Sequence, residues 1–195
     1  MWTKEVLGTD IYHIVHWFLI YSMLGWIIES IYMSICSHKL VNRGFAKGPY
    51  CPIYGVGALT VYFLLNSFRE DYLLLYVLGC IIATSLEYIT ARIMQSVFGE
   101  VWWDYKDKPY NYKGIICLES SIAWGLYTLF LFLFLHKGIQ WLVSRYSFQA
   151  GALLGRIILT AFMIDFIHSL YVAKKDALPD NLEAFKECIR GFYQR

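Results

Sequence analysis

Five long apolar stretches, separated by short polar segments, dominate the pattern of hydrophobic and polar positions along the chain. Each stretch is continuously apolar, which is typical of membrane-spanning helices and not of the alternating strands of a β-barrel. About 20 helical residues cross a hydrocarbon core of roughly 30 Å. We therefore predict an all-α polytopic membrane protein, a single membrane domain over residues 1–195 with five transmembrane helices. The predicted spans are about Ile11–Cys36, Pro49–Phe68, Tyr72–Phe98, Ile115–Leu135 and Gly151–Val172.

A shorter amphipathic helix is predicted after the last span, over about residues 177–193. Its apolar residues recur at helical spacing and form one stripe, with charged residues on the other faces. Such a helix lies in the cytoplasmic interface of the bilayer, or it packs against the bundle or a partner subunit. The stripe consists of Leu178, Leu182, Phe185, Ile189 and Phe192.

The composition fits this class, because 58% of the residues are hydrophobic and only 16% are charged. The net charge of +2 says little, but the positive charges are unevenly distributed between the two sides of the membrane. Eleven Lys and Arg fall in the loops Ser37–Gly48 and Gly99–Gly114 and in the tail after Val172, against four on the other side. The positive-inside rule therefore predicts an N-terminus outside and a C-terminus in the cytoplasm.

Several kinds of site are not indicated by the sequence. The five cysteines include no C-x-x-C and no Cys/His cluster with zinc spacing, so we expect reduced thiols, no metal and no cofactor. No G-x-x-x-x-G-K-[ST] occurs, and the chain therefore cannot be an ATPase by itself. Nothing in the sequence suggests that it binds nucleic acid.

The two halves of the chain resemble each other weakly. ESIYMSI (Glu29–Ile35) followed by GPYC (Gly48–Cys51) is similar to EYITARI (Glu87–Ile93) followed by GIIC (Gly114–Cys117). In each half a span carries a glutamate, a basic loop follows, and Gly-x-x-Cys opens the returning span. The pattern favours a parallel repeat of two helical hairpins with the fifth helix added, or it is a chance similarity.

Six ionisable residues are expected at membrane depth, where a charge is costly and needs a partner, water or a function. The four acids among them come from four helices and lie in the cytoplasmic half or near the midplane. Small residues share a helix face with several of these acids, which indicates that those faces point into the bundle. The acids form a shared polar site, or they pair off structurally. The six residues are Glu29, Glu87, Arg92, Glu119, Arg156 and Asp165.

The stretch NRGFAKGPYCPIYGVG, residues 42–57, concentrates helix breakers between two apolar runs. We expect the second helix to begin at Pro49, with Pro49 and Pro52 both in its first turn, where a missing N–H has no intrahelical partner. The helix would then begin near or below the membrane surface. Its free N–H groups, with Arg43 and Lys47, would attract an anion. The alternative is a tight turn that contacts lipid headgroups.

The second basic loop, EVWWDYKDKPYNYKG over residues 100–114, is dense in aromatic residues. An aromatic belt at the membrane interface accounts for several of them. Trp103 and Asp104, followed by Pro109 and Asn111, are more specific than a belt requires. This loop could form a lid or wall over a cavity.

Three segments carry a resemblance to a known family: GWIIES (residues 25–30), NRGFAKGPYCPIYGVG and EVWWDYKDKPYNYKGIICLESSIAWG (residues 100–125). They resemble small bacterial membrane proteins labelled "putative ABC-transporter type IV", or CmpB-like permeases, over roughly residues 10–135. The resemblance implies a multi-helix protein of the bacterial cytoplasmic membrane and a permease role. It implies no particular substrate.

The first hypothesis is a transport subunit that binds a polar or charged substrate in a cytoplasm-facing cavity within the lipid bilayer. A separate ATPase subunit would supply the energy if transport is driven by ATP. The second is an intramembrane enzyme that acts on a lipid or polyprenyl phosphate, with Glu87 or Asp104 as general acid or base. A third is a non-catalytic accessory subunit. The candidate substrate-binding residues are Glu29, Arg43, Lys47, Glu87, Arg92, Trp103, Asp104, Glu119 and Asp165.

Overall fold

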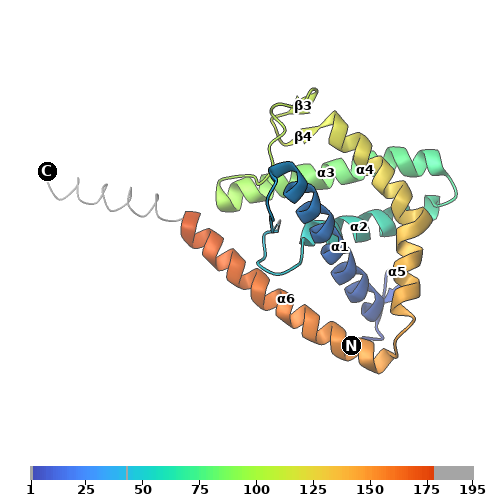
Figure 1. The fold of residues 1–195 in the computed structure, drawn as a ribbon. Helices are drawn as coiled ribbons and strands as arrows, with labels where there is room; N and C mark the ends of the chain where they lie inside the picture. The colour runs from blue at the N-terminus through green and yellow to red at the C-terminus, as the bar shows by residue number, and fades with distance from the viewer. Residues whose placement is uncertain (1, 43, 178–195) are drawn as a thin grey trace, which may run out of the picture.

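The computed structural model of the chain describes residues 2–42 and 44–177. Arg43 lies outside the described residues, and so does the predicted tail helix, about 177–193, apart from its first residue. The described chain is helical, with two short antiparallel hairpins that precede the first and fourth helices (Figure 1). The predicted all-α class is therefore confirmed.

The helices and strands follow one another along a chain with short connections. The hairpins pair β1 (Glu5–Val6) with β2 (Thr9–Asp10) and β3 (Asn111–Tyr112) with β4 (Ile116–Cys117). The helical elements are α1 (Ile11–Ser37), α2 (Pro52–Leu65), the 3₁₀ turn η1 (Asn66–Phe68), α3 (Tyr72–Phe98), α4 (Leu118–Phe130), the π-helical turn η2 (Leu131–Leu135), α5 (His136–Val143) and α6 (Phe148–Ala177).

Four helical segments of the described chain are long and apolar enough to cross a membrane. The second predicted span is the exception, because its apolar helix covers only Pro52–Phe68. Helices long enough to cross a membrane are therefore found at four of the five predicted spans. The four segments are Ile11–Ser37, Tyr72–Phe98, Leu118–Val143 and Phe148–Lys174.

The predicted start of the second helix was wrong, because α2 begins at Pro52 and not at Pro49. A residue that precedes proline is disfavoured in the helical conformation. Cys51 accordingly has extended backbone, with φ −123° and ψ 90°. Pro52 alone occupies the first turn of the helix, and Pro49 belongs to an irregular loop.

At the fourth predicted span the helical segment runs from Leu118 to Val143, past the predicted end of the span at Leu135. The π-helical turn η2 joins α4 to α5 without a break. One face of α5 is buried at helical spacing, at His136, Ile139 and Val143. The packed face of α4 therefore continues into α5, although Lys137 and Gln140 on α5 are polar.

Close helix pairs are made possible by glycines. A Cβ at Gly25 of α1 would overlap the ring of Tyr54 on α2, and a Cβ at Gly55 would lie 2.6 Å from Phe18 Cδ2. In the same way, Gly125 of α4 packs against Tyr76 of α3. Small residues therefore bring α1 against α2, and α3 against α4.

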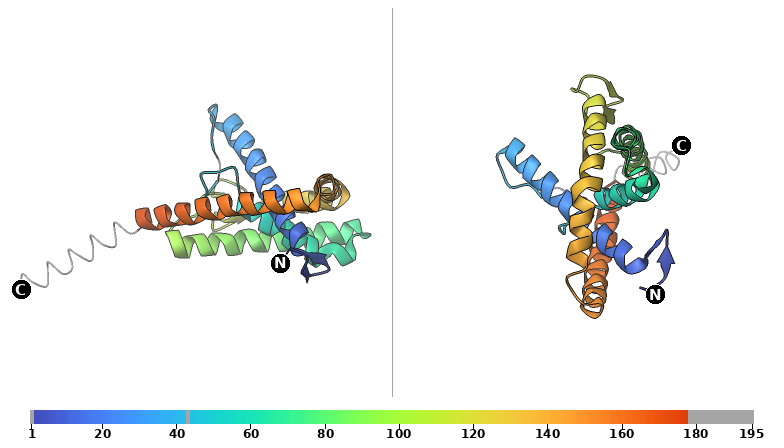
Figure 2. Two further views of the ribbon diagram at one scale, coloured as in Figure 1. Left: turned by 90° about the horizontal axis from the view of Figure 1, so that it is seen from below. Right: turned by 90° about the vertical axis from the view of Figure 1, so that its right-hand side faces the viewer.

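The long helix α6 runs along one side of the molecule and meets α1 near the N-terminus (Figures 1 and 2). Gly151 packs against the Tyr12 side chain, and a Cβ at Gly155 would lie 2.9 Å from the His16 ring. His16 Nε2 also lies 3.2 Å from the carbonyl oxygen of Gly151. Gly151 and Gly155 thus face the bundle.

An aromatic core lies at the same end of the bundle. The Tyr62 ring stacks on His136 with 3.8 Å between ring centroids, and Trp17 meets His136 edge-on at 4.5 Å. Tyr21 Oη lies 2.7 Å from His136 Nδ1. This packing draws α1, α2 and α5 together at the end of the bundle opposite the loops that follow α1 and α3.

Candidate functional site

The loop between α1 and α2 runs back along α1 before α2 begins. The Cys51 N–H donates to the Ser22 carbonyl oxygen at 2.9 Å. Ser22 precedes Ser37, the last residue of α1, by 15 residues, which is about 22 Å along a helix axis. Because α1 is a candidate membrane span, α2 begins deep beside it and not at its end.

Hydrogen bonds with side chains hold this returning loop in place. Trp26 Nε1 donates to Asn42 Oδ1 at 2.6 Å, and Asn42 Nδ2 donates to the Lys47 carbonyl oxygen at 2.9 Å. On the other side, the Gly48 N–H donates to Asp165 Oδ2 at 2.7 Å. The loop therefore bridges α1 and α6, and its irregular backbone is hydrogen-bonded by both helices.

The second returning loop, Val101–Cys117, is folded around the β3–β4 hairpin. The Tyr105 N–H donates to the Gly114 carbonyl oxygen at 2.9 Å, and Trp103 Nε1 donates to the Ile115 carbonyl oxygen at 2.8 Å. Gly114 has φ 68° and packs against Asp104, so a larger residue would be strained there. These bonds place the Tyr105 side chain over α3.

Glu87 lies at the centre of this region and is only 5% exposed. Its Oε1 accepts a hydrogen bond from Tyr105 Oη at 2.9 Å. Its Oε2 accepts from Trp124 Nε1 at 3.1 Å and from Ser120 Oγ at 3.4 Å. The carboxyl group of α3 is thus enclosed by donors from the second loop and from α4.

Glu29 of α1 lies close to Glu87. Its Oε1 accepts a hydrogen bond from Tyr54 Oη at 2.5 Å, and the Tyr54 ring lies 6.1 Å from the Trp124 ring that also binds Glu87. Burial raises the pKa of Tyr105 above its ordinary value, and the charges of Glu87 and Glu29 raise it further. We call Glu29, Glu87 and their partners Tyr54, Tyr105, Ser120 and Trp124 the two-glutamate site.

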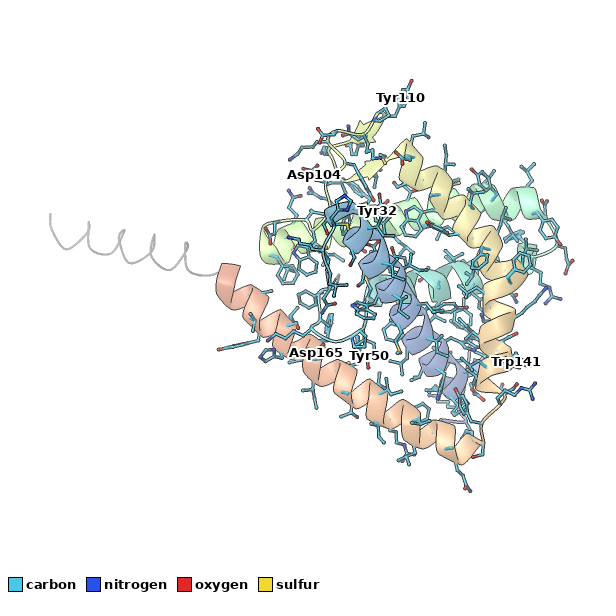
Figure 3. The ribbon with its side chains drawn as sticks, in the orientation of Figure 1. Tyr32, Tyr50, Asp104, Tyr110, Trp141 and Asp165 are labelled. Atoms are coloured by element: carbon cyan, nitrogen blue, oxygen red, sulfur yellow. The ribbon has the colours of Figure 1, made fainter. Side chains whose placement is uncertain are left out.

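The other acids predicted to share this site are elsewhere. Asp165 lies on α6 beside Tyr50, well separated from Asp104 on the second loop (Figure 3). Glu119 is exposed and pairs with Lys108 Nζ at 2.9 Å. This pairing raises the pKa of the Lys108 ammonium group. The predicted convergence of four carboxylates therefore holds for Glu29 and Glu87 alone.

The remaining candidates occupy the surface or support the loops. Asp104 is exposed and pairs with Lys106 Nζ at 3.1 Å. Arg92 is exposed and donates to Gln95 Oε1 at 3.0 Å. The Trp103 N–H is used inside its own loop, and Lys47 is exposed on the first loop.

Two hollows of the described structure lie outside the two-glutamate site. One is lined by α1 and residues 38–42, and the other lies between α3 and the β3–β4 hairpin, at Thr84, Tyr88 and Tyr112. Neither hollow is lined by a carboxylate of the site. A substrate cavity beside Glu29 and Glu87 thus stays a prediction.

Four site residues were missed by sequence reasoning: Tyr54, Tyr105, Ser120 and Trp124. A signal for two of them was present in the sequence. In each half, the hydroxyl that binds the glutamate is three residues after the cysteine that caps the returning helix, Cys51 before Tyr54 and Cys117 before Ser120. The apparent repeat could therefore have been used to search for hydroxyl partners.

The fold and this buried polar site define an all-α membrane protein with hydrogen-bonded glutamates between its helices. Comparison with curated proteins and with solved structures finds no match. A family model described as "Putative ABC-transporter type IV" matches residues 16–170. The match covers most of the chain, and the protein belongs to this family.

Proposed function

We propose that the protein is a membrane subunit of a transport system and that it binds a polar or charged substrate at the two-glutamate site. The single observation that carries the proposal is Glu87, a buried carboxyl group that accepts hydrogen bonds from three side chains beside a second carboxyl group. Charged groups at membrane depth are costly, and they commonly mark substrate or ion pathways. The family description is consistent with this role.

We further propose that the site is reached by water from the cytoplasm. Irregular backbone at membrane depth is tolerated only where it is buried in protein or lines a water-filled cavity. Cys51 and Gly48 of the first loop lie at the depth of Ser22 and Asp165, and Lys47 beside Gly48 is exposed. An exposed ammonium group at that depth needs water, which favours a wet entrance beside this loop.

The excess of positive charge on one side supports a topology with the N-terminus outside and the C-terminus in the cytoplasm of a bacterial cell. In it, α2 is a fifth membrane segment that spans part of the bilayer, after a loop that re-enters from the cytoplasmic side. The two hairpins, α1–α2 and α3–α4, would be parallel repeats. The equivalent Glu–hydroxyl pairs, Glu29–Tyr54 and Glu87–Ser120, favour this relationship.

Energy for transport would come from a separate ATPase subunit, because the chain carries no nucleotide-binding loop of its own. The two basic loops and the chain after α6 fall on the proposed cytoplasmic side and are the candidate contact surface. The lipid bilayer surrounds the remaining apolar faces.

The alternative is an intramembrane enzyme that acts on a lipid or polyprenyl phosphate. The enzyme alternative is favoured by the contacts of the buried Glu87 with the Tyr105 and Ser120 hydroxyls. The Glu87 carboxyl group could exchange a proton with a bound substrate. Asp104 suits this role less well. Hydrogen bonds from Lys106 hold the pKa of Asp104 below its ordinary value, which makes it a weaker base.

A comparison of metabolite content tests the proposed transport role. Cells expressing the native protein with its genomic neighbours are compared with cells expressing Glu87→Gln or the control Glu70→Gln, whose side chain is 87% exposed and lies next to Arg69. Transport predicts a polar solute whose intracellular amount changes with the native protein and the control but not with Glu87→Gln. Solute profiles that are the same in all three would overturn the proposal, and a modified lipid in place of a solute would favour the enzyme.

A further inference from the structure

A groove on the outer face of α1 has no part in the two-glutamate site. After Ser37 the chain reverses at His38, whose backbone is left-handed with φ 52°, and residues 38–42 run back beside the helix. The Val41 N–H donates to Ser34 Oγ at 3.0 Å, and Trp26 Nε1 donates to Asn42 Oδ1. Two hydrogen bonds thus fix one wall of the groove against the other.

The walls of this groove are mostly apolar. Ile27, Ile31 and Ile35 follow each other at i, i+4 spacing along about 12 Å of α1, and Leu40 and Val41 belong to the opposite wall. Ile31 is 56%, Ile35 68% and Leu40 98% exposed. The second half of α1 projects away from the other helices in both views of Figure 2, so the groove opens to the outside of the bundle.

Charge distinguishes one end of the groove from the other. His38 and Lys39 are part of its lining at the end of α1, and none of its lining residues is acidic. Ser30 and Ser34 add hydroxyl groups to the lining. An apolar groove with a cation at its end complements a lipid that has an apolar acyl chain and a negatively charged headgroup.

We propose that this groove is a binding site for an anionic phospholipid. One acyl chain lies along Ile27, Ile31 and Ile35, and the phosphate group lies at Lys39 and His38. The exposed Leu40 side chain then inserts between the acyl chain and its neighbours in the bilayer, which accounts for an apolar residue next to a charged one on this loop. The site is independent of the proposed transport role.

Native mass spectrometry of the full chain in detergent tests the headgroup contact. The protein is mixed with equal amounts of palmitoyl-oleoyl phosphatidylglycerol and palmitoyl-oleoyl phosphatidylcholine. We expect several-fold more phosphatidylglycerol to stay bound to the native protein. Lys39→Glu should abolish this preference, whereas the control Lys4→Glu, an equal charge change at the far end of α1, should retain it.

The acyl-chain contact is tested with a pair of double variants. Ile31→Ser/Ile35→Ser should lower retention of both lipids several-fold. Ile157→Ser/Ile164→Ser replaces two residues of α6 with closely similar exposure, 57% and 65%, and should leave retention unchanged. Circular dichroism melting curves identify any variant that has lost its fold, and Lys39→Glu, at an exposed loop position, keeps the test valid if the serine variants fail to fold.

Three results would overturn the lipid proposal. The first is equal retention of the two lipids by the native protein, or an unchanged preference in Lys39→Glu. The second is displacement of the lipid by inorganic phosphate, which would make the site one for a free anion. The third is a mass of two protein copies, without lipid, that Ile31→Ser/Ile35→Ser dissociates, which would make the groove a contact between copies of the chain.

Discussion

At the scale of single residues, Glu87 depends on the groups that donate to it. A buried carboxyl group that loses a donor loses about 1–3 kcal/mol of stability. Tyr105→Phe removes the donor to Oε1 and keeps the ring. We expect its free energy of unfolding in detergent to fall by that amount. Tyr110→Phe, in the same loop but 84% exposed, is the control and should be unchanged. Equal stability of both variants would mean that Tyr105 does not support Glu87.

Gly25 sets the position of Tyr54 and through it the surroundings of Glu29. A Cβ at residue 25 would overlap the Tyr54 ring, so Gly25→Ala must displace the ring or separate α1 from α2. We expect a loss of about 1–3 kcal/mol from overpacking. Gly57→Ala is the matched control on α2, because nothing lies within 4 Å of a Cβ there. The control should be neutral or stabilising, since alanine favours a helix. Chemical denaturation in detergent would compare the two variants, and a neutral Gly25→Ala would contradict the observed packing.

At the scale of elements, the two returning loops decide how the site is built. The second loop depends on Asp104, whose pKa is held below its ordinary value of 3.8 by the Lys106 backbone and side-chain N–H groups. A carboxyl group whose pKa is lower in the folded than in the unfolded protein stabilises the folded loop at pH values above its unfolded pKa. This stabilisation is lost as the pH falls through the lower pKa of the folded protein.

Hydrogen exchange of the Lys106 and Gly114 amides should therefore accelerate as the pH is lowered below about 4, after correction for the intrinsic exchange rate. Asp104→Asn should exchange faster than the native protein at pH 7 and should lack the acid-dependent step. Asp107→Asn, an exposed neighbour in the same loop, should behave like the native protein. An acid step that survives in Asp104→Asn would assign it to another group.

The first returning loop is predicted to be wet. A cysteine introduced at Lys47 should react with a membrane-impermeant, charged thiol reagent that is added from the cytoplasmic side of membrane vesicles. A cysteine at Ile164, an exposed apolar position of α6, should not react because it faces lipid. Labelling of Lys47→Cys only after the membrane is dissolved would mean that the loop is sealed from water.

The boundaries of these elements also show what sequence reasoning could predict. The ends of the continuous apolar runs predicted the bounds of α1 and α3 almost to the residue. This succeeded because the capping residues Asp10, Asp71 and Gly99 lie directly at the ends of those runs. The start of α2 was misplaced because the effect of Pro52 on Cys51 is a local backbone restriction that hydropathy does not report. The contact of Tyr105 with Glu87 could not be predicted, since it depends on how far the second loop returns along α3.

At the scale of the whole molecule, the placement of positive charge predicts orientation. Eleven Lys and Arg fall on one side of the proposed topology and four on the other. Alkaline phosphatase, which is active only outside the cytoplasm, should be inactive when it is fused after the last residue. It should be active when it is inserted after Arg69, between α2 and α3. The opposite pattern would invert the topology and place both returning loops outside the cell.

The molecule as a whole is arranged so that two helical hairpins and the loop of the second meet at Glu29 and Glu87. We propose that this meeting point binds a polar substrate. Native mass spectrometry of gently extracted protein tests it most directly, because a bound compound is detected by its mass whatever its chemical identity.

The expected result is a small polar compound bound to the native protein and to Glu119→Gln, whose acid is exposed and paired with Lys108. Its affinity should fall at least about tenfold in Glu87→Gln, equal to about 1.4 kcal/mol of binding free energy, and its occupancy should fall with it. Melting curves would confirm that the variant is folded. The same compound at equal occupancy in Glu87→Gln, or native protein that carries no small compound at all, would mean that the two-glutamate site does not bind a polar substrate.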